Sequence, residues 1–219
     1  MAVRSTQGRE RSGEAPVRGR ILEAAFSAFT EGGYAGTSTL EIATRAQVSK
    51  RALYELVGNK QEMLVACISA RARRLRVPAD LPEPRDRESF ANALTIFGTQ
   101  LVHEVSDPTV IAVFRLATAE ATRAPEVARA LDSIGGETTR AALQEIMTRA
   151  QSFGLVRGRP GEMAERFAGL LWGNLMIGLL LGIVDRPAQR EISRRAREAT
   201  AAFLQLYPQP DTLPEAFAG

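Results

Sequence analysis

Side chains with the chemistry to bind DNA are concentrated between residues 47 and 60. They carry amide, hydroxyl, ammonium and guanidinium groups and are Gln47, Ser49, Lys50, Arg51, Tyr54 and Lys60. Lysine and arginine neutralise phosphates, and amide and guanidinium groups form hydrogen bonds with base edges in the major groove. The segment is therefore predicted to contact both bases and phosphates.

The distribution of charge along the chain supports an acidic partner for this segment. Up to Lys60 the chain has nine basic and six acidic residues, and beyond it nineteen of each. The whole net charge of +3 therefore lies in the N-terminal part, as expected of a surface that meets a polyanion.

The spacing of apolar residues predicts the element that presents these side chains. Ala43, Val48 and Leu53 stand five apart, which suits two short helices that share apolar contacts across a tight turn. Gln47 lies in that turn. The pattern predicts a helix-turn-helix whose second helix exposes its cationic end.

Helix-capping residues predict where the helices of this segment begin. Ser38 with Glu41 three residues later is a capping box that opens a helix over residues 39–46. Ser49 caps a second helix that ends near residue 57, and Asn59 with Glu62 opens a third that continues to residue 77. A preceding helix over residues 17–31 is expected to end at the glycine pair 32–33.

Residues 17–64 resemble the DNA-binding domain of TetR-type transcriptional regulators. The resemblance is carried, in order, by Ile21-Leu-Glu-Ala-Ala-Phe, Gly33-Tyr-Ala-Gly-Thr-Ser, Glu41-Ile-Ala, Val48-Ser-Lys, Leu53-Tyr54 and Lys60. Gln47 stands where the family commonly has glycine, which implies a left-handed backbone conformation at a cost of about 1 kcal/mol. Leu56-Val57 replace the family's frequent His-Phe. The resemblance implies an all-α fold, with an N-terminal three-helix helix-turn-helix DNA-binding domain and a C-terminal helical ligand-binding and dimerisation domain.

The same resemblance implies roles for individual residues and partners. Tyr54 and Lys60 match positions that usually hold phosphate, and Thr37, Ser38 and Thr39 match a region that often touches the DNA backbone. It also implies a homodimer whose partners are double-stranded operator DNA and a small-molecule effector.

The rest of the chain is predicted to be helical and to form a second domain. Apolar residues recur at helical spacing near 87–105, 108–121, 125–152, 162–184 and 187–206, the third segment being broken at Gly135-Gly136. Pro78, Pro82 and Pro84 form the clearest linker. We expect a flexible basic tail over 1–16, the DNA-binding domain with its connecting helix over 17–77, the helical body over 78–207 and a loose C-terminal tail over 208–219.

Residues 167–184 form an apolar run without a charged side chain. Its length meets the lower limit for a membrane-spanning helix, but a helix that is apolar on all sides also suits a buried dimer seam. Asn174 in its middle favours the seam, so we expect no membrane association. The predicted interface residues are Gly173, Gly178, Leu181 and Phe203, and the two glycines are expected to let helices of the two protomers approach closely.

An apolar pocket for the effector is expected in the second domain. Its candidate lining consists of large apolar side chains and the one histidine, namely Phe97, Leu101, His103, Phe114, Met147, Trp172 and Met176. Ordinary core packing is the alternative for the apolar candidates, and a hydrogen-bonded helix position is the alternative for His103. Such a lining favours a hydrophobic or aromatic ligand.

The sequence offers little material for catalysis, and we expect no enzyme activity, metal or cofactor. A single histidine excludes a multi-histidine metal site, and there is no Gly-x-Ser-x-Gly motif or phosphate loop. Cys67 excludes an internal disulfide framework and is interpreted as a small core residue, with redox sensing as the alternative. One cysteine and no visible signal peptide fit a cytoplasmic protein.

These observations predict a transcriptional repressor that a small hydrophobic or aromatic effector releases from a pseudo-palindromic operator. Within the same class, the alternatives are a ligand-dependent activator and a regulator that needs a co-repressor. From another class, the alternative is a helical small-molecule-binding module without a DNA role. A membrane-associated protein that uses residues 167–184 is the remaining alternative.

Overall fold

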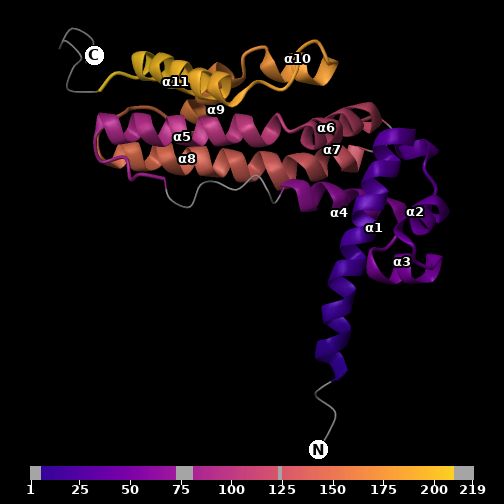
Figure 1. Ribbon diagram of the computed structural model, residues 1–219. Helices are drawn as coiled ribbons and strands as arrows, with labels where there is room; N and C mark the ends of the chain where they lie inside the picture. Colours follow the sequence, from indigo (N-terminus) through magenta and orange to yellow (C-terminus); the bar gives the residue numbers. More distant parts are fainter. Residues whose placement is uncertain (1–5, 73–80, 123–124, 210–219) are drawn as a thin grey trace, which may run out of the picture. The chain divides into compact units, whose positions relative to one another are not determined.

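The computed structural model describes residues 6–72, 81–122 and 125–209, and all regular structure in these ranges is helical (Figure 1). The elements in chain order are α1 (Thr6–Gly36), α2 (Thr39–Ala46), α3 (Lys50–Leu56), α4 (Lys60–Ala72), α5 (Arg87–Val105), α6 (Pro108–Glu120), α7 (Pro125–Leu131), the π-helical segment η1 (Asp132–Gly136), α8 (Glu137–Ser152), α9 (Pro160–Trp172), α10 (Leu175–Leu181) and α11 (Gln189–Leu206). The all-α fold class is confirmed. The segment η1 lies where Gly135-Gly136 predicted a break.

The first compact unit is built on α1, which begins earlier than predicted. Residues 6–16 were expected to be a flexible tail, but they belong to α1, with Pro16 inside the helix. Gly33 interrupts the helix with φ 72° and ψ 162°, a backbone conformation essentially restricted to glycine. The chain therefore changes direction at the predicted glycine pair, one short turn before α2.

A single apolar core holds α1 to α4 together. Ile21, Phe29, Ile42, Leu53 and Met63 have no exposed surface. Ala43 is also buried and Val48 is partly buried in this core. The apolar contacts predicted for a helix-turn-helix are confirmed.

The division of the chain into two units differs from the prediction, which placed all residues after 77 in the second domain. Residues 112–134 group with the N-terminal helices, and the second unit contains the described residues 81–111 and 135–209. The reason is packing, because Val113, Leu116 and Ala117 of α6 are buried in the core of α1 to α4. Residues 1–5, the linker around Pro78 and residues 210–219 lie outside the described residues.

The second unit packs α5 against α11, with α8 and α9 completing its core. Phe203 of α11 is fully buried, and its ring stands edge-on to Phe90 at 6.3 Å and to Phe167 at 5.8 Å between centroids. The prediction that Phe203 lies in a dimer interface is wrong, because its side chain fills the core of its own chain.

The long apolar run is divided at Gly173 and is not the single helix predicted for 162–184. Gly173 has φ 44° and ψ −126°, and the guanidinium of Arg195 donates to the carbonyls of Leu171 and Trp172 at 3.3 and 3.4 Å. These bonds satisfy carbonyls that a broken helix leaves without partners. No described helix is by itself long and apolar enough to span a membrane; α9 and α10 together are, by length and composition, but they are bent by 55°.

Gly178 permits a close approach within one chain. The chain turns back after Gly182, and the amides of Ile183 and Val184 donate to the Gly178 carbonyl at 2.9 and 3.3 Å. A Cβ at Gly178 would lie 2.8 Å from Cγ2 of Val184. The prediction that Gly178 lets two protomers approach is therefore wrong, because Val184 of the same chain occupies that space.

Candidate nucleic-acid interface

The turn of the helix-turn-helix has the geometry that its sequence predicted. Ser38 is the N-cap of α2, and its Oγ accepts from the Glu41 amide at 3.1 Å. Gln47 ends α2 with φ 55° and ψ 48°, and it is the one non-glycine residue with positive φ in the described part of the chain. The predicted left-handed conformation is confirmed, and it directs the chain from α2 into α3.

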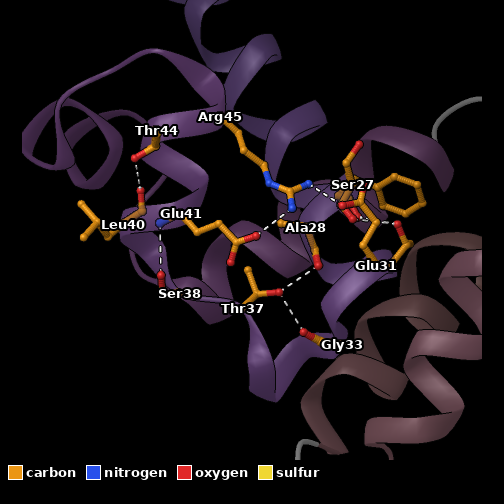
Figure 2. Close-up of polar contacts among 12 residues, drawn as sticks. Ser27, Ala28, Glu31, Gly33, Thr37, Ser38, Leu40, Glu41, Thr44 and Arg45 are labelled. Atoms are coloured by element: carbon orange, nitrogen blue, oxygen red, sulfur yellow. Dashed lines mark hydrogen bonds and ion pairs between the residues drawn. The ribbon is translucent and has the colours of Figure 1, made fainter.

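Thr37 anchors the start of α2 to α1 from inside the protein. The side chain is 3% exposed, and its hydroxyl lies 2.9 Å from the Ala28 carbonyl and 2.8 Å from that of Gly33 (Figure 2). The hydroxyl of Thr37 is therefore not available to DNA, contrary to the prediction. Ser38 remains exposed beside it.

Arg45 of α2 binds two carboxylates, that of Glu31 on α1 and that of Glu41 within α2 itself. Its guanidinium donates to Glu31 at 2.7 Å and to Glu41 at 2.8 Å (Figure 2). The hydrogen bond with Glu31 is the main reason why the pKa of Arg45 is raised above its ordinary value. Of the capping box predicted with Ser38, only the hydrogen bond from the Glu41 amide to the Ser38 hydroxyl is formed, because the Glu41 carboxylate pairs with Arg45.

The N-terminal end of α3 presents the predicted cationic side chains to solvent. Ser49 caps the helix by accepting from the Ala52 amide at 3.1 Å, and Lys50, Arg51 and Tyr54 are exposed. Lys50 Nζ lies 5.9 Å from the centroid of the Tyr54 ring. Gln47 and Ser49 are exposed just before α3, so these five predicted residues lie in the turn and at exposed positions of α3.

Glu55 is a neighbour of this surface that the sequence reasoning missed. Arg51 Nε donates to its carboxylate at 2.8 Å, and this hydrogen bond raises the pKa of Arg51. The spacing of four residues on a helix was the signal available in the sequence. The terminal amino groups of Arg51 can therefore contact a base while its Nε stays bound to Glu55.

Lys60 stands at the start of α4, beside a completed capping box. The Asn59 side chain accepts from the Glu62 amide at 3.0 Å, and the Glu62 carboxylate accepts from the Asn59 amide at 2.7 Å. The predicted box is confirmed. The box engages the amides of Asn59 and Glu62, and the Lys60 side chain supplies a positive charge beside them.

The predicted pocket residues are placed apart from the surface hollows that the structure describes. Phe97, Leu101 and Met147 are buried in the second unit, Trp172 and Met176 are half-buried there, and Phe114 is half-buried in the first unit. One hollow of about 580 Å³ lies along α4 and includes Arg18 and Ser69, and another of about 340 Å³ lies between Leu170 and α11. Neither is lined by a predicted pocket residue.

His103 and Cys67 both adopt the simpler of their two predicted roles. His103 is exposed on α5, where its Nδ1 lies 3.0 Å from Oε1 of Gln189 and its carbonyl accepts from Arg186 at 3.1 Å. Cys67 is fully buried, and its thiol donates to the Leu22 carbonyl at 3.2 Å. His103 is thus a hydrogen-bonded helix residue and Cys67 a core residue.

Comparison with protein families identifies the class of this molecule. Residues 21–67 match the model described as bacterial regulatory proteins, tetR family. Residues 92–209, more than half of the chain, match the AefR-like transcriptional repressor, C-terminal domain. The chain belongs to the TetR family.

Individual relatives of this TetR-family chain cover nearly its whole length. A solved structure from Mesorhizobium loti MAFF303099, assigned to the TetR family, has a TM-score of 0.77 and 27% identity over 89% of this chain and 98% of its own. The flavonoid-responsive regulator FrrA has a TM-score of 0.75 and 28% identity over 90% and 98% of the two chains. The uncharacterized HTH-type transcriptional regulator YvkB of Bacillus subtilis (strain 168) is 24% identical over 87% of this chain and 96% of its own.

Membership of the TetR family establishes a DNA-binding transcriptional regulator rather than an enzyme. Regulators of this family bind operator DNA and act as dimers with small-molecule effectors. A repressor role is consistent with the match of residues 92–209.

Proposed function

We propose that this TetR-family chain is a repressor that binds a pseudo-palindromic operator as a homodimer and releases it when a hydrophobic or aromatic effector binds. The observation that carries the DNA contact is the exposed N-terminal end of α3, where Lys50 and Arg51 follow the Ser49 cap. The half-sites of such an operator would lie about one helical turn apart. The proposal places the protein in the cytoplasm, with its operator.

Base readout by α3 is tested with Gln47→Ala, Lys50→Ala and Arg51→Ala on intergenic DNA beside the protein's own gene. Removal of a side chain that reads a base should weaken binding by about 1–3 kcal/mol and relax the preference at one operator position. Arg149→Ala on α8 is the matched control, because Arg149 pairs with Glu145 at the same 2.8 Å as Arg51 with Glu55. If all three variants select the wild-type consensus, α3 does not read bases.

Phosphate contact by Lys60 is tested through the salt dependence of binding. Lys60→Ala should weaken binding to all sequences alike, and it should lower the slope of log affinity against log salt by about one unit for each phosphate that Lys60 neutralises. A variant with wild-type affinity and slope removes Lys60 from the proposed interface.

An aromatic effector is supported by the likeness to FrrA, which is described as flavonoid-responsive and is 28% identical. Thermal unfolding in the presence of flavonoids and other planar aromatic compounds tests this class, because a ligand that binds only the folded state raises its stability. A stabilising compound should also weaken operator binding, since the two affinities are coupled reciprocally. A compound that strengthens operator binding would instead indicate a co-repressor or an activator ligand.

The dimer surface is proposed to lie on α10 and the turn that follows it. Four large apolar side chains are exposed there: Ile177 (60%), Leu181 (68%), Ile183 (73%) and Val184 (43%). A patch of this kind marks an interaction site more often than isolated apolar residues do. A second copy is the proposed occupant because TetR-family regulators act as dimers. Of the predicted interface residues, Leu181 stays in this proposal; Gly173, which ends α9, is also exposed.

A further inference from the structure

The ammonium group of Lys60 is held against an aromatic ring of α1. Its Nζ lies 4.5 Å from the centroid of the Tyr34 ring and 3.4 Å from the carbonyl oxygen of Ala35. Tyr34 and Lys60 are far apart in sequence and lie on either side of the helix-turn-helix. The contact therefore exists only because α1 and α4 are folded into one unit.

The Tyr34 ring is itself supported by the core. It leans on Phe29 with 5.5 Å between centroids and an interplanar angle of 48°, and Phe29 has no exposed surface. Gly33 supplies the change of chain direction immediately before Tyr34. Packing against Phe29 therefore restricts the position of the Tyr34 ring. A lysine side chain in water, in contrast, samples many rotamers.

The partners of Lys60 differ in charge from those of the neighbouring arginines. Arg45 and Arg51 each donate to carboxylates, which would compete with phosphate for the same positive charge. Lys60 instead contacts a ring face and a main-chain carbonyl, neither of which has a formal charge. Its full charge therefore remains for an incoming anion while its position is restricted.

We propose that Tyr34 is a positioning residue that holds the Lys60 ammonium at the corner of α1 and α4 for an operator phosphate. The proposal rests on the phosphate contact of Lys60 in the proposed function. The benefit is preorganisation, because less side-chain freedom is lost when DNA binds. A cation–π contact at an exposed site corresponds to about a two- to fivefold effect on affinity.

A double-mutant cycle on operator binding tests the proposal. Tyr34→Phe keeps the ring and should bind like wild type, whereas Tyr34→Leu keeps apolar contact with Phe29 and should bind about two- to fivefold more weakly. In a Lys60→Ala background, Tyr34→Leu should have no further effect, because the ring then has no cation to hold. Wild-type affinity of Tyr34→Leu, or additive effects in the cycle, would overturn the proposal.

Fluorinated phenylalanines at position 34 separate electrostatics from packing and also serve if Tyr34→Leu fails to fold. Successive fluorination weakens the negative face of the ring with little change in shape, so affinity should fall stepwise from the Tyr34→Phe value. A flat series would mean that the ring acts only by packing and would overturn the proposal. The ring-current shift of the Lys60 ε-methylene protons measures the contact in the free protein. Absence of this shift would also overturn the proposal.

The failure of this inference is distinguishable from failure of the proposed function. If Lys60→Ala binds the operator with unchanged affinity and salt slope, the proposed phosphate contact is wrong. If Lys60→Ala binds weakly but the Tyr34 series is flat, the phosphate contact stands and the role of Tyr34 falls.

Discussion

The hydroxyl of Tyr54 lies 3.2 Å from that of Thr39, which links the middle of α3 to the first residue of α2. Each hydroxyl can donate to only one acceptor, so the pair can bind each other and still leave one proton for a phosphate. Tyr54→Phe should weaken operator binding by about 1 kcal/mol if its hydroxyl reaches DNA. Thr39→Val removes the internal partner of Tyr54 together with a hydroxyl that the resemblance assigns to the DNA backbone, so both variants are compared with the double variant. Equal losses that do not add in the double variant, measured by fluorescence anisotropy, would mean that the hydrogen-bonded pair acts as one unit.

Gln47→Gly should stabilise the first unit. Gln47 has φ 55°, and a left-handed conformation costs a side-chain residue about 1 kcal/mol that glycine avoids. The greater freedom of glycine in the unfolded chain offsets part of the gain, so the midpoint of urea unfolding should rise modestly. Gln47→Ala keeps the strain and is the control; an equal rise in that variant would show that backbone strain is not the cause.

Gly58→Ala should destabilise the protein through the cap of α4. Gly58 has φ +93°, and a Cβ there would collide with the Glu62 carboxylate that completes the capping box. The weakened cap and the added backbone strain together should cost about 2 kcal/mol. Gly154→Ala is a matched control, because Gly154 has φ +70° but nothing within 4 Å of its added Cβ. Thermal unfolding should show the larger loss for Gly58→Ala; equal losses would exclude the collision.

Leu181→Asp should dissociate the proposed dimer. Leu181 is 68% exposed in the single chain, so a polar substitution there has little to disturb in the protomer fold but would bury a charge in the interface. Analytical ultracentrifugation at micromolar concentration should find a dimer for wild type and a smaller species for Leu181→Asp. Ile96→Asp, at an exposed isoleucine of α5, is the control. Gly178→Arg is a poor probe, since it would strike Val184 within the same chain.

Asp86→Asn should reduce the dependence of stability on acid. Hydrogen bonds from the Ser89 amide and then from its hydroxyl lower the pKa of Asp86 at the N-cap of α5. Because the folded pKa lies below that of the unfolded chain, the stabilisation is present above about pH 4 and is lost as pH falls through the folded pKa. Asparagine keeps an acceptor without titrating. In urea unfolding between pH 6 and pH 3, the free energies of unfolding of wild type and Asp86→Asn should therefore converge as the pH falls. A difference that stays constant with pH would contradict this prediction.

The sequence by itself determined the helix-turn-helix and most helix boundaries. Ser38, Ser49 and Asn59 cap their helices through hydrogen bonds to residues three positions later, so the information for each start is contained in a few neighbouring residues. The left-handed conformation of Gln47 was expected from the family resemblance, because glycine commonly stands at that position of the turn. The same local segment also carried the family resemblance.

Only the tertiary structure decided which side chains remain available at the surface. Thr37 looked like a DNA contact, but it is buried against the Ala28 carbonyl on α1. Phe203 and Gly178 looked like interface residues, but Phe167 and Val184 of the same chain cover them. An apolar or hydroxyl side chain has the same local pattern whether it faces solvent, a partner or its own core. The choice is made by contacts between elements distant in sequence, and these exist only after the helices have packed.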